Sequence, residues 1–321
     1  MSSSVFPLTA IICTRNPRAD ILARTLDCLD RQTLAKDQFE VILVDNGSTP
    51  PLDANPWMRG RSLSIRTVVE TEPGLNFARV AGIGACSGDL MVFVDDDNFL
   101  DPDYLENALR ITRENPRIGA FGGVARAKVE GDNAPTGWKQ RMLPYLGVRD
   151  YGGQPITSTD DKWGQWEPIG AGMVIRKDVA EKFVEFMRTH PGAARLDRAG
   201  KKLLSGGDSL MARSGYRLGY ACSYQPALKF DHFIKRSRLK TRYLCRIMAG
   251  HGRSYVILND TLGHPLPRLS IKELLGRFAY RVKKDGRFGA VGWFWDIGYF
   301  LEHRQTCKSP DQQADAPAPA H

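Results

Sequence analysis

Four short apolar runs in the first hundred residues alternate with segments that have helical periodicity. The runs that we predict to be strands are residues 8–13, 39–44, 63–69 and 90–94. The segments with apolar residues at helical spacing are 19–31, 74–86 and 102–114. Strands that are apolar almost throughout are buried on both faces, so this alternation predicts an α/β fold with a largely parallel central sheet and helices on both faces. Ligands of such sheets bind at the carboxyl ends of the strands.

The middle of the chain loses this periodicity. Residues 121–164 are rich in Gly, Pro, Trp and Tyr, which predicts a long, partly ordered region near a ligand. Further elements are expected in the order strand, helix, helix and strand pair, at residues 168–175, 177–188, 209–214 and near 220–230.

The last third of the chain has a different composition. Residues 234–304 carry many Lys, Arg and aromatic side chains, with candidate helices at 271–284 and 291–301. The sequence after Lys308 has the composition of a disordered tail. We therefore predict an α/β domain at 1–233, a helical appendage at 234–307 and a disordered tail at 308–321.

Three carboxylates stand in a row after the fourth predicted strand, in the sequence LMVFVDDDN at residues 90–98. Adjacent acids repel one another, and a divalent cation such as Mg²⁺ or Mn²⁺ would supply the counter-charge while keeping open positions for phosphate oxygens. Side chains of an extended chain alternate in direction, so Asp95 and Asp97 are expected on one side and Asp96 on the other. A solvated acidic turn or helix start is the alternative for an isolated run of this kind.

Two other strand ends are expected at the same edge of the sheet. Asp45 ends the second strand, where it is placed to accept the imide N–H of uracil or to form a turn with the residues that follow. The first strand runs into Thr14, Arg15 and a proline, which is typical of a helix start and offers groups that can grip a base.

Five short segments then carry a family resemblance. They are CTRN at 13–16, VDNGST at 44–49, GLNFAR at 74–79, SGD at 87–89 and FVDDD at 93–97. In this order and spacing they resemble the family 2 inverting glycosyltransferases, over at least residues 8–233. The resemblance implies a GT-A-like fold, a divalent metal, and a nucleotide diphosphate sugar, with a UDP-sugar as the expected donor.

The resemblance also implies roles for individual residues. With the loop after the first strand included, the predicted nucleotide-binding residues are Thr14, Arg15, Asp45, Arg79, Asp95 and Asp96. Asp97 is the implied metal ligand. Arg79 has a rationale of its own, because a guanidinium recognises phosphate in a bidentate way. Val80 departs from the family, which often has Asn there.

Downstream segments extend the resemblance. Residues 170–176, GAGMVIR, look like the small-residue strand beside the donor sugar, and Asp208 looks like the catalytic base that removes the proton of the acceptor hydroxyl. The family often has Glu where this chain has Gly207, which puts a second acidic role in doubt. His232 follows the last strand as a second predicted metal ligand, with Asp231 as its rival.

The excess of basic residues bears on partners. A formal net charge of +9 suits an anionic partner, and a glycan or lipid-linked acceptor is expected. Cations and aromatics at 235–242, 277–284 and 293–295 either pack as a helical subdomain or make peripheral contact with an anionic membrane. No nucleic-acid-binding signature accompanies the charge. Six scattered cysteines and the absence of a long apolar run indicate a cytoplasmic protein, with peripheral location at the inner face of the membrane as an option.

Two other functions are alternatives to sugar transfer. A sugar-nucleotide nucleotidyltransferase has a similar sheet, but it normally carries a Gly-rich loop after the first strand, which CTRNP at 13–17 lacks. A catalytically silent glycan-binding protein is the other alternative. The loops at 122–166 are expected to set specificity, so the donor sugar and the linkage cannot be predicted from these residues.

Overall fold

The computed structural model describes residues 6–52, 61–131, 134–197 and 203–306. The predicted tail at 308–321 lies outside these residues. The strands are β1 Leu8–Thr14, β2 Phe39–Asp45, β3 Ile65–Val69, β4 Leu90–Phe93, β5 Asn98–Leu100, β6 Ile118–Val129, β7 Ile156–Ser158, β8 Met173–Arg176 and β9 Ala221–Ile234. The helices of the α/β body are α1 Ala19–Asp30, α2 Leu75–Ala85, α3 Tyr104–Glu114, α4 Lys177–Thr189, α5 Pro191–Arg195 and α6 Gly207–Arg213.

Within the described residues the strands form one sheet, in the order β3-β2-β1-β4-β8-β6-β9-β5, with β7 paired to β9. The pairs among β3, β2, β1 and β4 are parallel, and β8 joins β4 and β6 in antiparallel fashion. The predicted α/β class is confirmed, with its parallel part in the half that the apolar runs predicted and a mixed half beyond β4. Register places Thr14 beside Asp45, and Asn98 beside His232.

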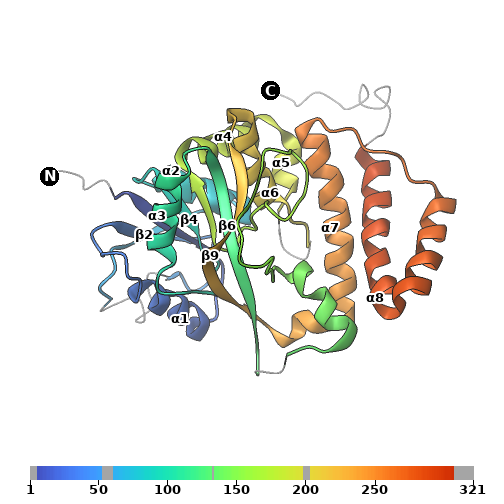
Figure 1. Cartoon of the computed structure of the whole chain (residues 1–321), viewed down its shortest axis with the longest axis horizontal. Coiled ribbons are helices and arrows are strands. Elements are labelled where there is room, and N and C mark those ends of the chain that lie inside the picture. The colour runs from blue at the N-terminus through green and yellow to red at the C-terminus, as the bar shows by residue number, and fades with distance from the viewer. Residues whose placement is uncertain (1–5, 53–60, 132–133, 198–202, 307–321) are drawn as a thin grey trace.

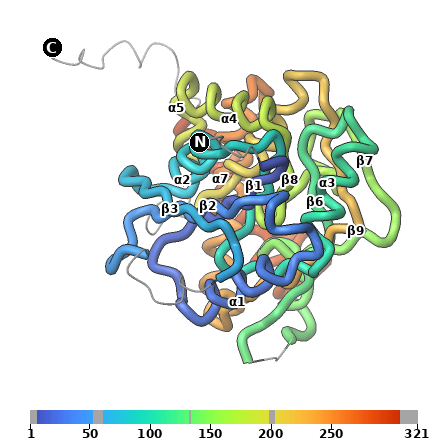
Figure 2. The backbone as a smooth tube through the Cα atoms, turned by 90° about the vertical axis from the view of Figure 1, so that its left-hand side faces the viewer, coloured from blue at the N-terminus to red at the C-terminus, as the bar shows by residue number. Residues whose placement is uncertain are grey.

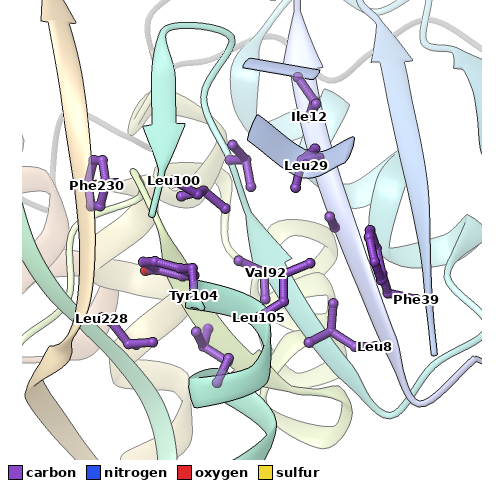
Figure 3. Close-up of a cluster of buried hydrophobic side chains, with 14 of the residues drawn as sticks. Leu8, Ile12, Leu29, Phe39, Val92, Leu100, Tyr104, Leu105, Leu228 and Phe230 are labelled. Atoms are coloured by element: carbon purple, nitrogen blue, oxygen red, sulfur yellow. The ribbon is translucent and has the colours of Figure 1, made fainter. Parts of the chain in front are cut away.

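Helices cover both faces of the sheet, as the alternation predicted. Neighbouring residues of β1 belong to different apolar clusters: Ile12 packs with Leu22 and Leu29 of α1, whereas Ile11 packs with Ala78 of α2. Figure 2 shows α1 on one side of the strands and α2 and α4 on the other. Figure 3 shows the first cluster, which continues through β4 and α3 to β9. Because β1 is buried on both faces, its carboxyl end is held rigidly at the edge of the sheet.

The aperiodic segment contains more regular structure than its composition predicted. β6 spans twelve residues, Ile118–Val129, and pairs with β9, while the 3₁₀ helix η3 covers Gly137–Leu146. Two adjacent glycines interrupt the apolar pattern of β6. At Gly123 a Cβ atom would lie 2.0 Å from the carbonyl oxygen of Leu228, so the close approach of β9 requires glycine there. The predicted strand pair near 220–230 is also one long strand, β9.

The C-terminal helices pack against the body on one side (Figure 1). They are α7 Thr241–Leu262 and α8 Ile271–Thr306, which follow the 3₁₀ helices η4 Ser214–Leu218 and η5 Arg236–Leu239. Gly286, at φ +53°, breaks α8 into two parts. An apolar cluster joins Val129 and Met142 of the body to Leu244 and Ile247 of α7. The appendage therefore shares a core with the body.

Candidate active site

The ends of β1 and β2 form one polar corner. Asp45 is 3% exposed, and its two carboxylate oxygens accept hydrogen bonds from the backbone N–H groups of Ser48 (2.8 Å) and Leu52 (3.1 Å). The loop after β1 is held to the loop after β2. Asn16 donates its backbone N–H to the Ser48 hydroxyl, and its side-chain oxygen accepts the backbone N–H of Thr49. Asp45 thus forms the turn that the sequence offered as the alternative to uracil binding. A carboxylate has about four lone-pair sites, so it keeps acceptor capacity for a ligand.

The acidic run lies in a tight turn after β4. β4 ends at Phe93, the backbone N–H of Asn98 donates to the carbonyl of Asp95, and the Asn98 side chain accepts from the Asp95 N–H. The extended alternation assumed for these residues therefore does not apply. The Thr14 hydroxyl donates to Asp96, which joins β1 to this turn. Burial, helped by the neighbouring Asp97 carboxylate, raises the pKa of Asp96 to about 6.

Asp97 and His232, the two predicted metal ligands, lie close together across the β5–β9 pairing. His232 Nε2 lies 3.7 Å from one carboxylate oxygen of Asp97, and Arg238 Nη1 lies 3.8 Å from the other. The side chains of Asp97 and His232 are almost fully buried. The rival residue Asp231 instead pairs with Arg126 at 2.6 Å.

Asp97 and His232 are the residues predicted to hold a divalent metal. In the part of the chain that the structure describes, no group of three or more His, Cys, Asp or Glu side chains is arranged around a common point. A carboxylate and an imidazole are nevertheless ligand types that Mn²⁺ accepts, and Mg²⁺ or Mn²⁺ bound with a nucleotide commonly takes one or two protein ligands plus phosphate oxygens. Asp97 and His232 fit a metal site of that incomplete kind.

Arg79 lies on α2 and is 5% exposed. Its Nη1 donates to the side chain of Asn76 at 3.2 Å, and its Nη2 lies 2.3 Å from where a Cβ atom on Gly170 would be. The start of α2 is held by Asp197, whose two oxygens accept the backbone N–H groups of Leu75 and Asn76, both at 2.9 Å. This anchoring fixes the helix that carries the guanidinium, since a carboxylate at a helix N-terminus satisfies otherwise unpaired donors.

Asp208 lies in the first turn of α6 and is half-buried. One carboxylate oxygen accepts the backbone N–H of Gly170 at 3.0 Å, and the other accepts that of Ser209 at 3.0 Å. Gly170 therefore touches both Asp208 and Arg79, so the two predicted residues converge on one backbone position. Gly207 also has a steric reason, because a Cβ atom there would lie 2.0 Å from Asn76 Oδ1. A Glu side chain would not fit at this position.

Cys13, next to Thr14, links the two groups of predicted residues. Burial raises the pKa of the Cys13 thiol to about 12. The charges that also act on it come from both groups: Arg79 lowers the pKa, while Asp95, Asp197 and Asp96 raise it. The guanidinium of α2 and the acids after β4 thus lie around the same strand end. Arg15 is exposed on the loop after β1, and no other described residue forms a hydrogen bond or ion pair with its side chain.

A buried ion pair that the sequence does not predict lies behind Asp208. Glu167 and Arg213 are each 2% exposed, and their side chains meet at 2.7 Å. Glu167 also accepts the hydroxyl of Ser209 at 2.6 Å, and its backbone carbonyl accepts Arg149 at the same distance. Burial raises the pKa of Glu167, although Arg213 opposes the rise. This network holds the first turn of α6, and no spacing in the sequence indicates it.

Comparison with known proteins adds the following. The model of the family described as glycosyl transferase family 2 matches residues 9–184. Validoxylamine A glucosyltransferase of Streptomyces hygroscopicus subsp. jinggangensis is 32% identical over 130 residues, which are 40% of this chain and 29% of that protein. Polypeptide N-acetylgalactosaminyltransferase 8 of Drosophila melanogaster is 31% identical over 113 residues, 34% of this chain and 19% of that protein. This chain therefore spans less than a third of the length of these relatives.

Among solved structures, the crystal structure of S. aureus TarS 1–349 aligns over 94% of this chain and 92% of that chain. The TM-score is 0.49 and the sequence identity is 13%.

Proposed function

Because the chain belongs to glycosyl transferase family 2, and is therefore a transferase, we propose that it moves a sugar from a nucleotide diphosphate donor to a glycan or lipid-linked acceptor with inversion. A UDP-sugar is the proposed donor. The observation that carries the proposal is the convergence of Arg79 and Asp208 on Gly170. A cation suited to phosphate and a carboxylate suited to proton removal both lie next to one backbone position.

The nucleotide is proposed to bind at the ends of β1, β2 and β4. Asp45 is oriented by two backbone N–H groups and keeps acceptor capacity for the imide of uracil. The Thr14 hydroxyl donates a hydrogen bond to Asp96 at the same corner. Asp95 is the residue proposed to bind the ribose. Arg79 would then face the diphosphate, where a charged donor contributes about 1.5–3 kcal/mol per hydrogen bond.

Asp208 is proposed as the general base. Its carboxylate takes the proton of the acceptor hydroxyl as that oxygen forms a bond to the anomeric carbon, while the bond from the anomeric carbon to the diphosphate oxygen breaks. A single displacement of this kind inverts the anomeric configuration. The electron pair leaves with the diphosphate, and Arg79 is the cation proposed to stabilise its charge. The Gly170 and Ser209 N–H groups orient the Asp208 carboxylate for this step.

Asp97 and His232 are the residues that would hold a divalent metal. When bound, such a metal would neutralise charge on the diphosphate. Arg238 Nη1 lies 3.8 Å from Asp97 and brings a further positive charge to this proposed metal site.

Membership of the family favours sugar transfer over a nucleotidyltransferase and over a silent binding protein. None of the described helices is long and apolar enough to cross a membrane. The cytoplasmic location expected from the sequence is part of this proposal.

A panel of nucleotide sugars tests the proposal. UDP-glucose and UDP-N-acetylgalactosamine come first, because the names of the relatives carry these sugars. We expect Mn²⁺-dependent release of UDP from at least one donor and a rise in melting temperature with UDP and Mn²⁺. GDP and CDP serve as matched controls and should give a smaller rise. If no donor is turned over and UDP gives no shift, the proposal is wrong.

A further inference from the structure

The first part of α8, residues 271–284, presents apolar side chains to solvent. Figure 1 shows it as the outermost helix at the right edge of the molecule, with the second part of α8 between it and α7. Four residues spaced by four, three and four positions form what we call the apolar stripe. They are Ile271, Leu275, Phe278 and Val282, which are 59%, 58%, 38% and 37% exposed. This spacing places them on one face of a helix.

The packed side of this helix uses mainly other residues, although the ring of Phe278 also contacts that of Trp293, with 4.7 Å between the ring centroids. Arg277 and Arg281 form ion pairs with Asp296, at 3.1 and 2.6 Å, and Asp296 is fully buried. Trp293 donates its indole N–H to the carbonyl of Leu274 at 2.9 Å. Arg277, Arg281 and Trp293, which the sequence suggested for a membrane, therefore hold the helix to the second part of α8 instead. The apolar stripe is left for another partner.

Exposed lysines border the apolar stripe. Lys272 and Lys283 follow its first and last members and are eleven positions apart, which is three helical turns, so they lie on the same side. Neither forms an ion pair with any residue that the structure describes. In the same stretch Glu273 is engaged with Ser270 at the start of the helix. The charge beside the apolar stripe is therefore positive and available.

We propose that the apolar stripe and its lysines dock the enzyme on the surface of an anionic bilayer. A helix of this length is about 21 Å long, and it would lie flat with its stripe in the acyl boundary and its lysines at the phosphates. A second copy of the chain is a poorer occupant, because two such faces would bring lysines of like charge together. The residues after 307 are also a poor cover, since 308–321 contain no Leu, Ile, Val, Phe or Trp.

Vesicle co-sedimentation tests this surface with the full chain. We expect binding to vesicles of equal parts phosphatidylcholine and phosphatidylglycerol, and much weaker binding to phosphatidylcholine alone. Ile271→Gln with Leu275→Gln should lower binding at least tenfold, because each large apolar side chain contributes more than one factor of ten when buried. Lys272→Gln with Lys283→Gln should lower it about fivefold per lysine. Higher salt should weaken binding of the wild type.

Leu218→Gln is the matched control, because Leu218 is 44% exposed and lies on η4. It should bind vesicles as the wild type does. Equal binding by the stripe variant, or no binding by the wild type, overturns the proposal. A wild-type dimer that the stripe variant converts to monomer assigns the surface to a second copy instead. The assay contains neither donor nor acceptor, so its failure leaves the proposed sugar transfer untouched.

Discussion

The two halves of the sheet hold their polar residues in different ways. At the ends of β1 and β2, Asp45 and Asn16 are tied to backbone groups of neighbouring loops. Behind Asp208, in the other half, a fully buried ion pair between Glu167 and Arg213 holds α6. The first arrangement is built from turn-forming residues that are neighbours in the sequence, so it can be predicted from the local pattern. The second depends on two charges 46 positions apart, and the loss of either one would leave the other buried and uncompensated.

The largest expected effect follows from breaking the buried pair. Arg213→Met leaves Glu167 charged and unpaired in the core, which should lower the free energy of unfolding by about 3–5 kcal/mol. Urea denaturation measures this change. Adding Glu167→Leu should recover much of the loss, because it removes the stranded charge.

Arg110→Met is the matched control. Arg110 pairs with Glu114 on α3 at 2.8 Å, with both side chains about half exposed, and such a pair contributes about 0.2–1 kcal/mol. If Arg213→Met costs no more than Arg110→Met, the two halves do not differ in the way described.

The next effect should appear in nucleotide binding with little loss of stability. Arg79→Met should weaken the affinity for UDP about 10- to 100-fold, the equivalent of one or two charge-assisted hydrogen bonds. Calorimetric titration with UDP measures it. Arg15→Met is the comparison, because Arg15 is the other arginine predicted to bind the nucleotide and, being exposed, should contribute less. A loss in Arg15→Met with unchanged affinity in Arg79→Met would mean that the loop after β1, and not α2, binds the phosphates.

A smaller effect should follow from crowding the position where the two halves meet. Gly170→Ala places a Cβ atom 2.3 Å from Arg79 Nη2 and 3.2 Å from Asp208 Cβ. The guanidinium must move, so kcat/KM should fall about tenfold, since even a small misplacement in a site is costly. Gly84→Ala on α2 is the control, because a Cβ atom there meets nothing within 4 Å. An unchanged kcat/KM in Gly170→Ala would show that activity does not depend on the position of the Arg79 guanidinium.

The comparison also explains what could be predicted from the sequence. Continuous apolar runs gave β1, β2 and β4 to within one or two residues, because both faces of these strands are buried. Asp97 and His232 are the metal ligands predicted from the sequence; they lie 3.7 Å apart, and their role stays a prediction. These features depend on local pattern or on motifs at strand ends, where one sequence carries enough information.

Other features depend on partners far along the chain. The glycines of β6 reflect the close approach of Leu228, and a glycine pair in isolation reads as a loop. Nothing near Glu167 indicates that Arg213 will neutralise it. In the appendage the tryptophans were candidates for the surface, yet Trp293 bonds to Leu274 and the apolar stripe is exposed. Which face of a helix packs is decided by its neighbours, and α7 and the second part of α8 are those neighbours.

The central claim is that Asp208 removes the proton of the acceptor, and single-turnover kinetics of Asp208→Asn tests it most directly. The amide keeps the size of the side chain but cannot act as the base. With donor saturated and UDP affinity unchanged, we expect the rate of sugar transfer to fall about 10²- to 10⁴-fold, the usual contribution of a general base. An Asp208→Asn enzyme that transfers sugar at the wild-type rate would contradict the claim.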